Sequence, residues 1–402
     1  MSQSLKNLLL ASCVSLALIG CSNNTTQSGS TETPDAAAGD RLPVMTDAAS
    51  YGKAAAEWQL STINDLSYLP GRIPQSSYNR GWVKGAFYIG LERFAETTGN
   101  QEYLDLLLNE SYENGFELGE RYWHGDDQIF GTIYAGALKR NPEVGVELLR
   151  PTLEKMDLIL EDRSTVSLEF VEPKPGEAGA EGTCQTRWCW ADAIFMAPPA
   201  WSAVSNVTGD EKYRKYAIEE TDATIEYLYD EETGLFFRDS RYFKYKTENG
   251  GKVMWSRGNG WVYAGLVRFI ETLPKDHPAR DRYEALFRSM TDALISRQRE
   301  SGYWPTSLDD DALFPNPETS GTAFFGFGLA WGVNQGILTD TKYITARDKA
   351  WTAMKNAVKP TGMVGWVQQI GKDPQATEKN SSQLYGVGGF LLMSSEMVKA
   401  GQ

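Results

Sequence analysis

The sequence predicts an all-α protein in which helical hairpins close into a toroid, and three observations lead to this prediction. From about residue 45 onward, apolar residues recur with the helical period of about 3.6, in long stretches separated by short Gly, Pro, Asn and Asp segments. A helix-capping motif repeats along the chain. Some of the predicted helices are amphipathic, whereas others are apolar on nearly every side.

The capping motif marks the start of three similar helices. Residues 98–103, 208–213 and 338–343 each contain a Gly or Thr break, then an Asn or Asp suited to an N-cap, and then a Tyr expected to point inward. The three tyrosines are 110 and 130 residues apart, which corresponds to two helical hairpins in each interval. A second pair of similar segments, 90–97 and 265–272, indicates that related helices recur.

Two classes of helix imply two layers. Residues 210–229 form an amphipathic pattern, whereas 321–333 and 384–393 are apolar nearly all round and must be buried by other helices. We therefore expect an inner and an outer ring made of about six hairpins, an (α/α)6 barrel. Segments 165–170 and 235–245 have strand character and are expected to be hairpin or loop pieces over the helical body.

Composition narrows the class of ligand. The 402 residues are 41% hydrophobic and 23% charged, as in folded globular proteins, and the net charge of −14 argues against a nucleic-acid partner. An anionic ligand must therefore be met by local Arg or Lys. The 12 Trp and 19 Tyr either stack on sugars or fill the core. Neither His124 nor His277 has a partner at metal-ligand spacing, so we predict no metal and no cofactor.

The N-terminus is typical of an exported lipoprotein. An apolar run follows Lys6 and ends at Cys21 in the sequence Leu-Ile-Gly-Cys, which resembles the bacterial lipoprotein box. We predict a signal peptide over 1–20, a lipidated Cys21 with a flexible tether over 21–44, and a single catalytic domain over 45–402. The protein is then expected in the cell envelope, at the outer membrane or in the periplasm, held to the membrane only by its lipid.

Two cysteines remain in the predicted domain. Cys184 and Cys189 are five residues apart, and thiols of exported proteins can pair oxidatively. A disulfide and two free buried thiols are both compatible with the sequence. The oligomeric state is left open between monomer and dimer.

Polar and aromatic residues precede each expected inner helix, at 78–82, 124–127, 188–192, 255–261, 318–320 and 382–385. In the run 188–199, Asp192 is a single acid among aromatic and aliphatic residues. A carboxyl group in such surroundings is costly to ionise and can hold a proton near neutral pH. Asp192 is therefore the first candidate for a general acid, although an Asp at this position can also simply cap a helix.

Two acids and a guanidinium ringed by Trp and Tyr suit a sugar that carries a carboxylate. Arg257 can bind a carboxylate through two parallel hydrogen bonds, or it can serve a structural ion pair. His124 is a candidate ligand contact. One of Asp126 and Asp127 is expected to cap the helix that begins near residue 129. Two carboxylates are also compatible with an ordinary glycosidase.

The motifs of the chain resemble those of glycoside hydrolase family 105, the unsaturated rhamnogalacturonyl and glucuronyl hydrolases. The resemblance covers nearly all of residues 50–400 and rests on Trp82-x-x-Gly85, Asp126-Asp127-x-x-x-Gly131, the run 190–199, the run 255–261, the run 319–323 and Tyr385-Gly386-x-Gly388. It implies an (α/α)6 barrel without a metal or covalent intermediate. It also implies hydrolysis of a 4,5-unsaturated uronic acid from the non-reducing end of lyase-generated oligosaccharides, by hydration of its double bond.

The resemblance also implies roles for single residues. Asp192 donates a proton to C4 and then helps to deprotonate water. Asp127 orients water or sugar hydroxyls, and Arg257 takes the carboxylate or a ring hydroxyl. Trp190 and Trp261 stack on the sugar, although Trp261 can equally be a core ring. The remaining candidates for substrate binding are His124, Asp126, Trp82 and Tyr385.

The chain departs from that family at two positions, where Arg187 and Arg238 stand in place of histidines that members acting on pectin fragments often carry. We hypothesise that these arginines favour a more anionic aglycone, such as sulfated rhamnose in ulvan fragments. Other activities remain open: a conventional glycosidase, a lyase or a sugar epimerase on the same barrel, or a surface lipoprotein that binds glycans without catalysis. With only two histidines in the chain, an epimerase that relies on histidine is disfavoured.

Overall fold

An inner ring of helices forms the centre of the computed structural model, which describes residues 42–70, 78–172, 174 and 182–402. Consecutive members of the ring pack against one another, and the last member packs against the first. The inner helices are α3 (Trp82–Thr98), α5 (Phe130–Arg140), α8 (Pro198–Thr208), α10 (Ser256–Thr272), α12 (Thr319–Asn334) and α14 (Leu384–Lys399).

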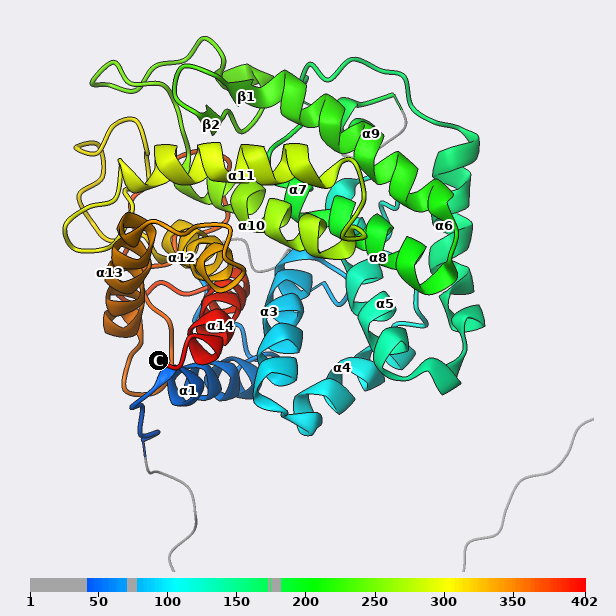
Figure 1. Ribbon diagram of the computed structural model, residues 1–402, viewed down its shortest axis with the longest axis horizontal. Coiled ribbons are helices and arrows are strands. Elements are labelled where there is room, and N and C mark those ends of the chain that lie inside the picture. The colour runs from blue at the N-terminus through cyan, green and yellow to red at the C-terminus, as the bar shows by residue number, and fades with distance from the viewer. Residues whose placement is uncertain (1–41, 71–77, 173, 175–181) are drawn as a thin grey trace, which may run out of the picture. The chain divides into compact units, whose positions relative to one another are not determined.

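An outer ring of helices surrounds the inner one (Figure 1). Along the described chain, outer and inner helices alternate, so that each outer helix is followed in sequence by an inner one. The outer helices are α1 (Ala48–Ser61), α4 (Gln101–Glu113), α6 (Arg150–Glu161), α9 (Glu211–Leu228), α11 (Arg280–Ile295) and α13 (Thr341–Ala357). The predicted barrel of six hairpins is confirmed.

Burial separates the two rings as the sequence predicts. In α12 every residue from Thr319 to Gly332 is buried, whereas α9 buries only one of its faces. The predicted caps are confirmed as well. Asn100, Asp210 and Asp340 each accept a hydrogen bond from a main-chain N–H in the first turn of α4, α9 and α13.

Glycines allow the inner helices to approach closely. A Cβ atom added to Gly90 of α3 would lie 2.2 Å from the main-chain oxygen of Gly388 in α14, and one added to Gly388 would lie 2.2 Å from that of Ala86. The similar segment 265–272 begins with Gly265, where a Cβ would lie 2.6 Å from the oxygen of Ile194. Both glycines of the repeated segments are therefore required by the packing of the inner ring.

Short elements connect the hairpins. They are the helical turn α7 (Ala193–Met196), the 3₁₀ turns η1 (Gly125–Gln128), η2 (Pro142–Val144), η3 (Val146–Leu149), η4 (Cys184–Arg187) and η5 (Ser240–Tyr242), and the antiparallel strands β1 (Tyr229–Asp230) and β2 (Leu235–Phe236). Of the two segments with strand character, 235–245 begins with β2, whereas 165–170 contains no strand. Both lie over the helical body as loop and hairpin pieces.

Residues Leu42–Gln402 form one compact unit. Within the described part of this unit, no helix combines the length and the apolar character that crossing a bilayer requires. The predicted signal peptide over 1–20, Cys21, and the predicted tether apart from residues 42–44 lie outside the described residues.

Candidate active site

A pocket lies where the chain enters α3 and η1, at the N-terminal ends of inner helices. Its volume is about 670 Å³, within the range of about 300 to 1,000 Å³ that small-molecule sites occupy. Its described lining consists of Tyr78, Asn79, Arg80, Gly81, Trp82, Gly119, Glu120, Arg121, Asp126 and Asp127. Three of the predicted site residues, Trp82, Asp126 and Asp127, therefore share one pocket.

Asp192 stands directly before α7, in a segment that is fixed from several sides. Cys184 and Cys189 form a disulfide in this segment, which decides between the two alternatives left open by the sequence. The main-chain oxygen of Trp188 accepts a hydrogen bond from the hydroxyl of Thr224 at 3.0 Å. Beside Asp192, the N–H of residue 191 donates to the main-chain oxygen of Arg238 at 2.8 Å. The backbone that carries the acid is thus tied to both neighbouring segments.

The side chain of Asp192 makes no capping hydrogen bond to α7, so the capping interpretation is wrong. Its Oδ2 instead accepts a hydrogen bond from Nε of Arg238 at 3.2 Å, and the residue is 9% exposed. Arg238 also donates to Asp239 at 2.8 Å. The surroundings of Asp192 therefore include an ion pair in addition to the apolar residues that its own sequence supplies.

Asp126 is electrostatically coupled to Asp192. Burial raises the pKa of Asp126 to about 7, and the negative charges of Asp192 and Asp127 add to the rise, while Arg121 and Arg238 oppose it. Near neutral pH this carboxyl group therefore exists in both protonated and ionised forms. A proton is available in the site at the pH at which acid catalysis is required.

Asp127 has a different environment from Asp126. Its carboxylate accepts hydrogen bonds from the main-chain N–H of Arg121 at 2.8 Å and from the Arg121 guanidinium at 2.6 Å. Burial raises the pKa of Asp127, and the charge of Arg121 opposes that rise. The helix α5 has no side-chain cap, so the expectation that Asp126 or Asp127 caps it is wrong. Within η1, Asp127 is thus held by Arg121, whereas the charge of Asp126 interacts with that of Asp192.

His124 is buried and neutral. Burial, helped by the positive charges of Arg121 and Arg238, lowers its pKa well below the usual value. Its Nδ1 accepts a hydrogen bond from the N–H of Asp126 at 3.2 Å, which leaves the proton on Nε2. The ring lies against Trp190, with centroids 4.5 Å apart. His124 therefore positions Asp126 while keeping one N–H donor.

The predicted aromatic residues differ in how far they are open to a ligand. Trp82 is partly exposed in the pocket and stacks on Tyr385 with centroids 5.4 Å apart. Trp190 and Trp261 are each only 1% exposed, and Trp261 packs against Phe195 beneath the site. Trp82 is thus the ring whose face is accessible in this structure, and the stacking roles of the two buried rings remain predictions.

Arg257 is buried, and both of its terminal nitrogens are used within the protein, whereas its Nε has no hydrogen-bond partner in the described structure. Its two terminal nitrogens donate to the main-chain oxygens of Gln368 and Gln369, both at 2.8 Å. The guanidinium lies between the rings of Trp255 and Tyr385, at 4.4 and 4.8 Å from their centroids. Arg257 therefore anchors the loop before α14 in this structure, and its contact with a substrate carboxylate remains a prediction.

The two arginines that depart from the family pattern are both paired with carboxylates. Arg187 donates to Glu220 at 3.1 Å and to the main-chain oxygen of Val166 at 3.1 Å, and it does not line the described part of the pocket. Arg238 pairs with Asp192 and Asp239. Both side chains thus already have carboxylate partners, and their preference for a more anionic aglycone stays a hypothesis.

Sequence reasoning missed Arg121. Its side chain is 41% exposed and lines the pocket beside Asp126 and Asp127. A signal was present in the sequence, because this basic residue directly precedes the aromatic run that leads into His124. Among the described residues, no group of three or more His, Cys, Asp and Glu side chains has the arrangement of a metal site.

Fold and site together define a carbohydrate-processing enzyme on an (α/α)6 barrel, with two coupled carboxyl groups beside a pocket that an indole ring lines. Comparison with known proteins identifies the family. The chain belongs to Glycosyl Hydrolase Family 88, whose model matches residues 52–400. It is therefore a glycoside hydrolase, as predicted.

The relatives and solved structures that match the chain agree with this assignment. An "Unsaturated 3S-rhamnoglycuronyl hydrolase" of Alteromonas sp. (strain LOR) is 41% identical over 98% of both chains. A protein of the same name from Formosa agariphila is 37% identical over 79% of this chain and 84% of its own length. The structure of a family 88 glycosyl hydrolase from Bacteroides vulgatus matches with a TM-score of 0.70 and 27% identity, covering 86% of this chain and 99% of the other.

Possible members of family GH105 share the fold, for example one from Klebsiella pneumoniae with a TM-score of 0.67 at 17% identity, covering 94% of this chain and 100% of its own. The resemblance to the unsaturated uronyl hydrolases that the motifs indicate is thereby confirmed. At the level of this class, the predicted removal of an unsaturated uronic acid from oligosaccharides is confirmed as well.

Proposed function

We propose that this hydrolase removes a 4,5-unsaturated uronic acid from oligosaccharides in which the neighbouring sugar is a 3-sulfated rhamnose, as in fragments of ulvan. Two relatives with this specificity in their names support the proposal, one of them aligned over 98% of the chain. The observation that carries the reaction type is the buried carboxyl group of Asp126, whose pKa is raised to about 7 by burial, with the charge of Asp192 adding to the rise.

The reaction follows from the chemistry of the substrate ring. The 4,5-unsaturated uronic acid contains a vinyl ether, so a proton added to C4 leaves an oxocarbenium-like centre at C5. Water adds to C5 and gives up a proton, and the resulting hemiketal opens and releases the neighbouring sugar as an alcohol. Asp192 donates the first proton and accepts the second, so that the enzyme ends the cycle in its starting protonation state.

Asp126 is the second acid in this proposal, in place of Asp127. Its charge interacts with that of Asp192, and its pKa lies near 7 because of burial and that interaction. Asp127 is occupied by three hydrogen bonds from Arg121. His124 holds Asp126 through its main-chain N–H. Asp126 can therefore hold a proton near pH 7, close enough to Asp192 for their charges to interact.

We assign to Arg121 the role of binding the sulfate group of the substrate. Because the chain carries a net charge of −14, a sulfated substrate must be held by a local cation. The side chain of Arg121 is 41% exposed on the pocket wall, and Arg80 lines the same wall. Some N–H donors of this guanidinium bind Asp127, and the others are available to a sulfate oxygen.

Kinetics on the sulfated and desulfated forms of one unsaturated disaccharide test this assignment. Replacing Arg121 by Gln should raise KM for the sulfated substrate about tenfold or more, with little effect on the desulfated one. Arg187→Gln is the matched control, because Arg187 pairs with Glu220 away from the described pocket lining. An equal loss on both substrates, or a sulfate preference that survives in Arg121→Gln, would overturn the role of Arg121.

The location of the protein is a separate proposal. The apolar run that ends at Cys21 supports export and lipid attachment at this cysteine, with the enzyme held to the cell envelope by a tether over 21–44. Labelling with a radioactive fatty acid tests it. Label should enter the full chain and be lost in Cys21→Ala, and label retained in the variant would contradict the proposal.

A further inference from the structure

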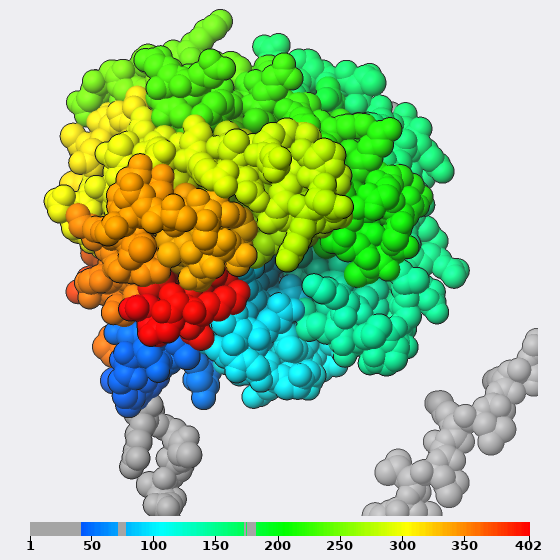
Figure 2. All heavy atoms as spheres, viewed as in Figure 1, coloured from blue at the N-terminus to red at the C-terminus, as the bar shows by residue number. Residues whose placement is uncertain are grey.

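A second cavity opens at the other end of the barrel. Its volume is about 220 Å³, and it is lined by the second half of α3 together with parts of α5, α8, α10 and α14. The space-filling view shows a hollow at the centre of this face, between α3, α10 and α14 (Figure 2). Trp82 of the first pocket and Glu96 of this cavity are separated by 14 residues of one helix, or roughly 21 Å at the usual rise.

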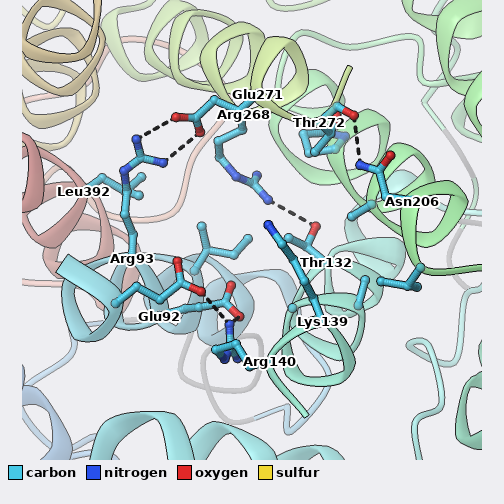
Figure 3. Close-up of a pocket in the computed structure, with 17 residues that line it drawn as sticks. Glu92, Arg93, Thr132, Lys139, Arg140, Asn206, Arg268, Glu271, Thr272 and Leu392 are labelled. Atoms are coloured by element: carbon cyan, nitrogen blue, oxygen red, sulfur yellow. Dashed lines mark hydrogen bonds and ion pairs between the residues drawn. The ribbon is translucent and has the colours of Figure 1, made fainter. Parts of the chain in front are cut away.

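Most charges in this cavity are paired. Arg93 forms ion pairs with Glu271 at 2.8 Å and with Glu396 at 2.6 Å. On the opposite side, Arg140 pairs with Glu92 and Glu96. Figure 3 draws the pairs of Arg93 with Glu271 and of Arg140 with Glu92 around the rim of the cavity. Each of the three carboxylates that line the cavity therefore already has a cationic partner.

Two cations in the same cavity have no carboxylate partner among the described residues. Arg268 is 6% exposed, and its terminal nitrogens donate only to neutral acceptors, the main-chain oxygen of Phe195 and the hydroxyl of Thr132. Lys139 forms no ion pair with any described residue. Figure 3 shows its ammonium group directed toward the Arg268 guanidinium and Thr132. Two like charges that point toward one another repel, and an anion between them would offset this repulsion.

A third cation leaves a donor unused. Nη2 of Arg140, which also lines the cavity, is buried without a hydrogen-bond partner in the described structure. Buried donors of this kind are usually satisfied by a water molecule or an ion. Burial also lowers the pKa of Arg268 to about 9, against the opposing effect of Glu92 and Glu271. A bound anion would relieve each of these costs.

We propose that this cavity binds a small tetrahedral oxyanion, sulfate or phosphate, between Lys139 and Arg268. The hydroxyl of Thr132 and the unused donor of Arg140 are further groups that can reach such an ion. The volume of about 220 Å³ lies below the range of about 300 to 1,000 Å³ for larger ligands, which favours an ion with water over an oligosaccharide. Neither the fold nor the proposed hydrolysis assigns a role to this site.

Titration calorimetry of the full chain with sodium sulfate tests the proposal, with sodium chloride at equal ionic strength as the reference. We expect saturable sulfate binding in the wild type and at least about tenfold weaker binding in Lys139→Gln. Lys139 is exposed and makes no described ion pair, so this variant should fold normally. Lys275→Gln, a substitution of another exposed lysine, is the control and should bind as the wild type does.

Further measurements distinguish a free anion from one carried by a sugar and locate the binding site. Inorganic phosphate and rhamnose 3-sulfate are titrated in parallel, and the tighter ligand identifies whether the ion is free or carried by a sugar. If sulfate instead binds beside Arg121, Lys139→Gln should leave its affinity unchanged. Selenate soaked into crystals should give an anomalous peak between Lys139 and Arg268. No saturable binding, or equal affinity in the wild type and Lys139→Gln, would show that these cations only offset the carbonyl ends of nearby helices.

Discussion

Asp192 shows how much the chemistry of one residue depends on distant parts of the chain. Its own sequence predicts an acid in an apolar setting, and the structure adds Arg238, which is 46 residues away in sequence. Nothing local predicts this ion pair, because it forms only when β2 and the segment after it are packed beside α7. The acid was therefore predictable from the sequence, whereas its partner was not.

Substitution of the two candidate acids should separate their roles. We expect Asp192→Asn to reduce kcat by about 100-fold or more, since a general acid contributes about 10² to 10⁴. Asp127→Asn should reduce kcat much less, because that carboxylate is bound by Arg121. Initial rates on an unsaturated disaccharide, with circular dichroism as a folding control, measure both. Equal losses in the two variants would contradict the separate roles.

The raised pKa of Asp126 has a consequence for stability. The folded protein holds this proton up to about pH 7, whereas the unfolded chain releases it near 3.8, the ordinary pKa of an Asp side chain. The stability that this one carboxyl group contributes is therefore fully present below about pH 4 and is lost as the pH rises through about 7. Asp126→Asn should raise the free energy of unfolding at about pH 8 by on the order of 2 to 4 kcal/mol, and change it little at about pH 4. Denaturant unfolding at both values measures this difference, and a variant less stable at pH 8 would contradict it.

Among the elements, the inner helices were the most predictable from the sequence. The apolar patterns of 321–333 and 384–393 place α12 and α14 in the inner ring, because helices without a polar face must be buried. The loops were less predictable. Arg257 donates to main-chain oxygens of Gln368 and Gln369, more than 100 residues away, and such contacts leave no periodic pattern in the sequence.

The contact between α3 and α14 predicts the effect of a single methyl group. In Gly388→Ala, the new Cβ would lie 2.2 Å from the oxygen of Ala86, so the helices must separate, at a cost of about 1 to 3 kcal/mol. Gly131→Ala in α5 is the matched control, because its Cβ would meet its nearest neighbours at 3.4 Å. Thermal unfolding should show a lower Tm for Gly388→Ala only. Equal Tm values would mean that the ring does not depend on this contact.

For the whole molecule, closure of the ring brings together residues from most of the chain. Trp82 and Tyr385 stack on each other although they stand near opposite ends of the sequence, because α14 packs against α3. The motif order predicted which helix ends meet, since the inner helices begin at the same end of the barrel. The sequence did not predict which of two adjacent acids, Asp126 or Asp127, is held by Arg121 and which interacts electrostatically with Asp192, because a change of one residue in a 3₁₀ turn redirects the side chain.

The most direct test of the account compares two disaccharides that differ only in the C4–C5 double bond of the uronic acid. The purified enzyme should release rhamnose 3-sulfate from the unsaturated one, with an equal loss of the ultraviolet absorbance of the double bond, and should leave the saturated one intact. Asp192→Asn should slow both signals by about 100-fold or more. Hydrolysis of the saturated disaccharide at a comparable rate would contradict hydration of the double bond and indicate an ordinary glycosidase.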